Sequence, residues 1–135
     1  MRLVVDANVL FSALIKDSIS SELIFSKGLE LYTPQIILEE LAKHLGYLKG
    51  KTQRSDIEFN RLIESFKTAV SVISNKELSS FVEGADIISP DPNDILYFAV
   101  AIMLGAPIWS NDKALKKQDR IKIYTTAELL KELGL

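Results

Sequence analysis

Acidic side chains recur in four short segments of this chain, at residues 3–8, 38–41, 91–94 and 108–112. Carboxylates that share one pocket without cationic partners commonly bind divalent metal ions. Two carboxylates about 5 Å apart repel each other by roughly 3 kcal/mol at an effective dielectric near 20. Four acids that converge on one site would therefore need protonation or bound cations. This pattern predicts a metal-dependent enzyme.

Two of the acids follow hydrophobic segments with the character of strands. Asp6 comes directly after Leu-Val-Val, and Asp112 comes two residues after the segment 107–110. Ligands of α/β sheets bind outside the carboxyl ends of the strands, so both acids are expected at that edge. Each acid taken alone is equally compatible with capping a helix N-terminus.

The third acidic segment precedes the most apolar stretch of the chain. Residues 95–104 are apolar on every side of a helix, which predicts a helix buried in the centre of the domain. Asp91 is expected to cap this helix, with Pro92 next to it. Asp94 lies deeper in the first turn and is the better candidate for a metal ligand.

Helical periodicity separates the neighbouring acids Glu39 and Glu40. Apolar residues at 37, 41, 45 and 48 form one stripe along the expected helix. At about 100° per residue, Glu39 lies nearly opposite this stripe, whereas Glu40 lies on its border. A border position can reach a cleft beside the core, so Glu40 is the expected ligand.

The composition limits the cofactor and the location. The chain has 135 residues, 47% of them apolar, and a net charge of −2, so it has no global positive field. It has no cysteine, and oxygen ligands favour Mg²⁺ or Mn²⁺ over zinc. No signal peptide is evident, and the longest apolar run, 95–109, is shorter than the ~20 residues of a membrane span. We expect a cytoplasmic protein without a membrane partner.

Strand-like and helix-like segments alternate along the chain, and together they predict one domain over residues 1–135. We expect an α/β fold, a three-layer sandwich with a mainly parallel sheet of four or five strands. The expected strands are 2–6, 29–33, 70–73, 107–110 and 121–124. The expected helices are 8–16, 19–27, 34–48, 53–69, 76–87, 91–104 and 126–134, with a short helix after 112 and a polar break at 49–51.

The four acidic motifs occur in a specific order. A hydrophobic strand ends at Asp6 with Asn8 two positions later, Glu40 lies early in a helix, and Asp94 heads an apolar helix. Ser-Asn-Asp at 110–112 then follows a strand. In this order the chain resembles, over essentially its whole length, the PIN-domain nucleases, which include the ribonuclease toxins of prokaryotic toxin–antitoxin pairs.

The resemblance implies a PIN-like fold and Mg²⁺- or Mn²⁺-dependent hydrolysis of phosphodiester bonds in single-stranded RNA. It also implies a cognate antitoxin and assembly into a homodimer or a higher homo-oligomer. The implied catalytic residues are also the metal ligands, namely Asp6, Glu40, Asp94 and Asp112. Asn8 and Ser110 are implied to orient these ligands, with Asp91 as an outer group. Asn111 stands where the family more commonly has Gly.

Further residues could take part in RNA binding or assembly. A basic cluster after Asp112 is expected either to contact RNA or to form a solvated face, and it comprises Lys113, Lys116, Lys117, Arg120 and Lys122. A looser basic patch has the same two interpretations, and it comprises Lys43, Lys49, Lys51 and Arg54. His44 is expected to be packed or at a dimer interface rather than catalytic. The surface expected to form a dimer comprises Ile19, Leu23, Ile24, Leu129, Leu130 and Leu133.

Two other classes of function fit parts of the pattern. The chain could be a non-catalytic or weakly active PIN-fold module that binds RNA or protein. It could also be another metal-dependent phosphohydrolase. Haloacid-dehalogenase-type phosphatases need a second Asp where this chain has Asn8. Response-regulator receivers need an acidic pair and a late Lys that the sequence does not supply.

Overall fold

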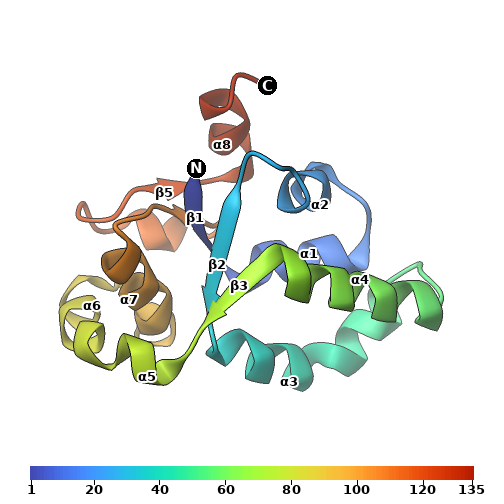
Figure 1. Cartoon of the computed structure of the whole chain (residues 1–135), viewed down its shortest axis with the longest axis horizontal. Coiled ribbons are helices and arrows are strands. Elements are labelled where there is room, and N and C mark those ends of the chain that lie inside the picture. The colour runs from blue at the N-terminus through green and yellow to red at the C-terminus, as the bar shows by residue number, and fades with distance from the viewer.

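The computed structural model of the 135-residue chain contains one sheet of five strands, all of them parallel (Figure 1). The strand order is β3-β2-β1-β4-β5, which places β1 at the centre. This confirms the expected parallel sheet. The strands are β1 (Arg2–Val5), β2 (Glu30–Pro34), β3 (Val70–Ile73), β4 (Ile108–Trp109) and β5 (Ile123–Tyr124).

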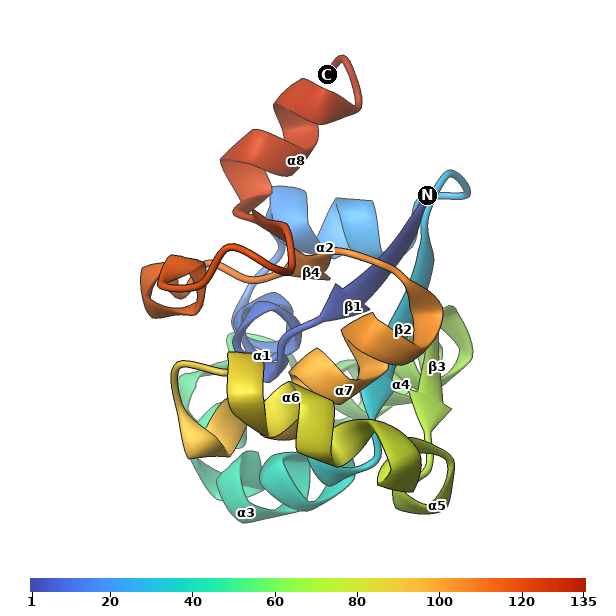
Figure 2. The same ribbon diagram turned by 90° about the vertical axis from the view of Figure 1, so that its left-hand side faces the viewer.

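Helices cover both faces of this sheet, so the expected three-layer α/β sandwich is confirmed (Figures 1 and 2). One face carries α1 (Ala7–Ile15), α2 (Ile19–Ile24), α3 (Ile36–Lys51) and α4 (Asp56–Ala69). The other face carries α5 (Asn75–Leu78), α6 (Val82–Ile88) and α7 (Ile95–Leu104). Short 3-10 turns lie at Ser79–Phe81, Pro92–Asp94 and Lys113–Lys116, and α8 (Thr126–Glu132) ends the chain.

The core lies around β1 and α7. Leu3, Val4 and Val5 are fully buried in the central strand, and five consecutive residues of α7, Tyr97 to Ala101, are at most 2% exposed. A helix that is apolar all round must be enclosed, and α7 packs against β1, β2 and β4. None of the helices has both the length and the apolar character needed to cross a membrane.

Two expected helix boundaries around α3 are wrong. Pro34 does not open the helix, because it ends β2 opposite Ile73, and the next residue, Gln35, donates its N–H to the Ile73 carbonyl at 2.9 Å. The sheet therefore continues through Pro34, and α3 begins at Ile36. The expected polar break at 49–51 is also absent, because α3 runs on to Lys51. The expected helix over 76–87 is divided into α5, a 3-10 turn and α6.

The prediction of the dimer surface is also wrong in part. Leu23, Ile24 and Leu129 are at most 4% exposed within the single chain, so these side chains belong to its own core. Ile19 is the exposed member of the set, at 53%. The homodimer therefore stays a prediction, without half of the residues assigned to its surface.

We expect Gly105→Ala to destabilise the protein by about 1 kcal/mol, because Gly105 ends α7 with φ at 61°, where a Cβ is strained. Gly46→Ala is the matched control. Gly46 lies inside α3 with open space around a Cβ, so that change should stabilise by ~0.5–1 kcal/mol. Urea denaturation of both variants measures the difference, and a shift of the same sign in both would contradict the prediction.

Candidate active site

Asp6 anchors the site at the carboxyl end of the central strand. Its backbone N–H donates to the Trp109 carbonyl at 3.0 Å, which continues the pairing of β1 with β4. Its carboxylate accepts a hydrogen bond from the Ser110 hydroxyl at 2.7 Å and makes no capping bond to α1. Asp6 is 6% exposed, so it is a buried acid oriented by a neighbouring strand.

Asp112 reaches the same region from the loop after β4. Its N–H donates to the Ser110 hydroxyl oxygen at 3.1 Å, so one serine hydroxyl contacts both acidic residues. One carboxylate oxygen of Asp112 accepts the N–H of Ala114 at 3.0 Å and caps the following 3-10 turn. Asp112 is exposed, and it is both a helix cap and a charge close enough to raise the pKa of Asp6.

Glu40 contacts a tyrosine that the sequence analysis did not select. The Tyr97 hydroxyl donates to Glu40 Oε1 at 3.3 Å and stays protonated, because burial and the charge of Glu40 raise the pKa of Tyr97. Tyr97 lies three residues after Asp94 on the same helical face, which is the signal that could have identified it. Glu40 is half-buried and Glu39 is exposed, as the helical phase predicts. Both side chains nevertheless line the same cleft, so the expectation that Glu39 cannot reach it is wrong.

The two aspartates before α7 have separate roles. Asp91 is exposed, and its Oδ1 accepts the Asn93 N–H at 2.8 Å, so it is the expected cap. Asp94 is half-buried and makes no capping hydrogen bond. Its carboxylate therefore does not cap the helix and is available to bind a ligand.

Three of the four expected metal ligands line one cleft, which we call the carboxylate cleft, and Asp112 is not among its wall residues. Its volume is about 550 Å³, and its walls include Asp6, Glu39, Glu40, Asp94 and Tyr97, with Lys43 at the side. None of the five ion pairs in the structure involves the carboxylates of this site. No three acidic side chains lie close enough together to enclose one ion directly.

Burial and mutual repulsion raise the pKa values of three carboxyl groups in the site. Desolvation is the largest cause for each of them. The pKa of Asp94 rises to about 6, and the surrounding negative charges add to the effect of burial. Hydrogen bonds from Ser110 to Asp6 and from Tyr97 to Glu40 oppose the rise at those two acids. The site is therefore short of positive charge.

The donor set fits a hard divalent cation. It consists of carboxylate oxygens, which Mg²⁺ and Mn²⁺ prefer, and it contains no thiolate. Mg²⁺ usually keeps several waters and binds through one or two carboxylates, so the wide spacing of these acids is compatible with it. A cation would also offset the repulsion that raises the pKa of Asp94.

Asn111 fixes the loop that carries Asp112. Its amide N–H donates to Thr126 Oγ1 at 3.0 Å, and its carbonyl accepts the Thr126 N–H at 2.8 Å. The same Thr126 oxygen accepts the Trp109 indole N–H at 3.0 Å. Asn111, which stands where the family more commonly has Gly, therefore connects the loop of Asp112 to the start of α8 through two hydrogen bonds.

The other residues expected to take part in the site make no side-chain hydrogen bond to its acids. Asn8 is exposed on the wall of the carboxylate cleft, and its side chain makes no hydrogen bond to an acid. In the basic cluster, Lys116 pairs with Glu128 and lowers the pKa of Glu128 to about 2. Lys113 and Lys117 are exposed and unpaired, and they stay candidates for RNA contact.

A family model described as the PIN domain matches residues 4–134, which is nearly the whole chain. The chain belongs to the PIN domain family. PIN domains are generally nucleases, which are hydrolases, and they generally use divalent metals. The resemblance inferred from the acidic motifs is confirmed.

Solved structures agree with this PIN fold. VapBC2 from Rickettsia felis, bound to a DNA fragment from their promoter, matches at 17% identity and a TM-score of 0.63, covering 93% of this chain and 98% of that chain. PAE2754 from Pyrobaculum aerophilum matches at 17% identity and a TM-score of 0.65, with coverages of 99% and 90%. No curated protein matches the chain.

We expect Asp94→Asn to stabilise the metal-free protein by ~1–2 kcal/mol at pH 7, a figure discounted because Asp94 is partly exposed. Between pH 4 and pH 6 the folded state holds more protons than the unfolded state, since its pKa is higher. Wild-type stability should therefore fall relative to the variant as the pH rises through this window. Thermal melts in chelator across the window measure this, and a variant that is less stable at pH 7 would contradict it.

Proposed function

We propose that this PIN domain is a divalent-metal-dependent endoribonuclease that hydrolyses phosphodiester bonds of single-stranded RNA. The observation that supports the proposal is the arrangement of the carboxylate cleft. Asp6, Glu40 and Asp94, from three separate segments, line it at the carboxyl edge of a parallel sheet, and Asp112 lies outside this lining but close enough to raise the pKa values of Asp6 and Asp94. No lysine or arginine forms an ion pair with these acids. Mg²⁺ or Mn²⁺ is the proposed cofactor.

Each acid has its own part in the proposed site. Asp6, Glu40, Asp94 and Asp112 would hold the cation, directly or through water. The cation, when bound, lowers the pKa of a coordinated water and stabilises charge at the phosphate. Ser110 keeps the Asp6 carboxylate in one orientation through its hydrogen bond of 2.7 Å, and Tyr97 does the same for Glu40 at 3.3 Å.

The nuclease proposal predicts that Glu40→Gln loses most hydrolysis of single-stranded RNA with little loss of stability, because the carboxamide cannot replace the anionic ligand. Glu39→Gln makes the same change in charge in the wall of the same cleft, on an exposed side chain without hydrogen bonds, and should keep most of the activity. Cleavage of labelled RNA in Mn²⁺ and in chelator measures both variants. Wild-type protein that shows no Mn²⁺-dependent cleavage would instead favour a non-catalytic binding module.

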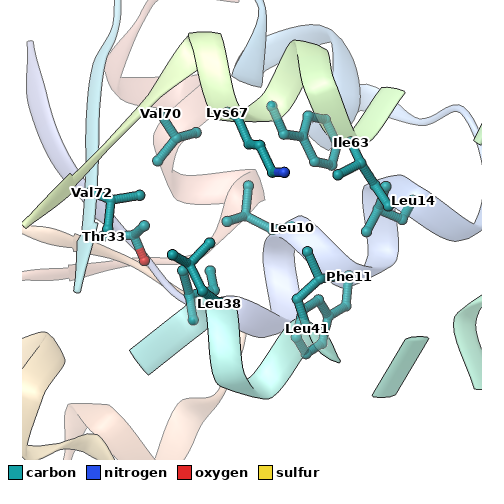
Figure 3. Close-up of a pocket in the computed structure, with 12 residues that line it drawn as sticks. Leu10, Phe11, Leu14, Thr33, Leu38, Leu41, Ile63, Lys67, Val70 and Val72 are labelled. Atoms are coloured by element: carbon teal, nitrogen blue, oxygen red, sulfur yellow. The ribbon is translucent and has the colours of Figure 1, made fainter. Parts of the chain in front are cut away.

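We also propose that the protein is the toxin of a toxin–antitoxin pair, as the VapBC2 complex suggests by its fold. An apolar pocket of about 50 Å³ lies between α1, α3 and α4, on the face of the sheet that these helices cover (Figure 3). Ten of its twelve lining residues are hydrophobic, and two of them, Leu38 and Val72, are 43% and 40% exposed. An apolar side chain of an antitoxin would fit this opening, beside Lys67.

The antitoxin proposal is tested with the product of a small gene encoded next to that of this chain. We expect the product to co-purify with wild-type protein and with Ile87→Asp, but not with Leu38→Asp. Ile87 is the matched control because it is 83% exposed on α6, on the opposite face of the sheet. Retention of the partner by Leu38→Asp would exclude this pocket as the docking site.

A further inference from the structure

A second cleft lies directly beside the carboxylate cleft, and aromatic rings line it. Its volume is about 370 Å³, and two residues, Asn8 and Glu40, form walls of both clefts. Phe11 of α1 and His44 and Tyr47 of α3 supply the rings, and we call this second space the aromatic cleft. The shared walls mean that the two clefts adjoin each other along α3.

The rings of the aromatic cleft are open to solvent. Tyr47 leaves 62% of its surface exposed, and His44 is exposed as well. Phe11 is half-buried, and its ring centroid lies 5.8 Å from that of His44, with the planes tilted by 58°. The exposure of Tyr47 means that its ring adds little to the core, so it is available to a ligand.

Positive charge lies along the same face of α3. Lys43 is a wall residue of the carboxylate cleft, and Lys51 Nζ lies 5.7 Å from the centroid of the Tyr47 ring. Residues 43, 47 and 51 are spaced by four, so they share one helical face over about 12 Å. Arg54 does not belong to this surface, because its guanidinium donates to the Leu14 carbonyl and to Asp17.

We propose that the aromatic cleft binds an unpaired nucleobase of single-stranded RNA, next to the phosphate that enters the carboxylate cleft. The base stacks on Tyr47, and Lys43 and Lys51 lie beside the flanking phosphates. Every base has a π face, so the subsite tolerates different sequences, and it requires a base that is free of a paired strand. The proposal deepens the nuclease proposal and rests on it, since it assigns this chain a contact that selects single strands.

The test measures binding of a short labelled single-stranded RNA by anisotropy, in chelator and at low salt, so that hydrolysis does not interfere. We expect Tyr47→Ala to weaken binding about tenfold, which equals ~1.4 kcal/mol. Tyr47→Phe keeps the ring and should bind as the wild type does. Ile57→Ala removes an apolar side chain that is 67% exposed on α4 outside both clefts, and it should leave binding unchanged.

RNAs that lack a single base, one position at a time, identify the contact. At the position that stacks, the wild type and Tyr47→Ala should bind the baseless RNA equally well. Equal loss of affinity for intact and baseless RNA at every position, or no loss at all, would overturn the proposal.

Cleavage assays in Mn²⁺ separate the two proposals. Base-dependent binding without cleavage would reject the nuclease proposal and support the base-binding subsite. Cleavage without base-dependent binding would reject the subsite proposal alone.

Discussion

The hydrogen bond from the Asp6 N–H to the Trp109 carbonyl joins the two central strands at the point where both end. It sets the register in which Ser110, the next residue of the chain after β4, faces the Asp6 carboxylate. A shift of β4 by one residue would turn Ser110 to the other face of the sheet, because side chains alternate along a strand. The orientation of the buried acid and the start of the loop to Asp112 both follow from this pairing.

The apolar core makes ionisation of the neighbouring acids unfavourable. α7 is buried because it is apolar, and its burial brings Asp94 and Tyr97 against the carboxylate cleft. Desolvation, more than charge repulsion, is what raises the pKa values of the acids there. The hydroxyls of Ser110 and Tyr97 offset part of this cost by hydrogen bonds, and neither carries a charge. The negative charge of the ionised acids is therefore not neutralised by any ion pair within the chain, and a bound cation would neutralise it.

The sequence was sufficient for the sheet, the layers and the placement of Asp6, Glu40 and Asp94 in one cleft, because strands and helices here have clear periodicity. It did not predict that Glu39 also lines this cleft or that Asp112 does not. It was insufficient where a tertiary contact overrides a local signal. Pro34 is a good helix starter, yet pairing with β3 keeps it in the sheet. Leu129 has the pattern of an amphipathic surface, yet the fold encloses it. Tyr97 was not selected from the sequence, because it lies within an apolar stretch that gives no sign of a polar partner. Its partner Glu40 is on α3, so the contact depends on where α3 lies relative to α7.

The contact between Asp6 and Ser110 spans 104 positions, nearly the length of the chain, and this has a consequence for timing during synthesis. A ribosome adds about 5–20 residues per second, so roughly 5–20 s pass between the synthesis of Asp6 and that of its partner Ser110, just after β4. Until then, the central strand lacks one neighbour, and the loop that carries Asp112 does not yet exist. A nascent chain therefore has only part of the site. If the chain cuts RNA as proposed, each copy becomes able to do so only after β4 and the loop that follows it have been synthesised.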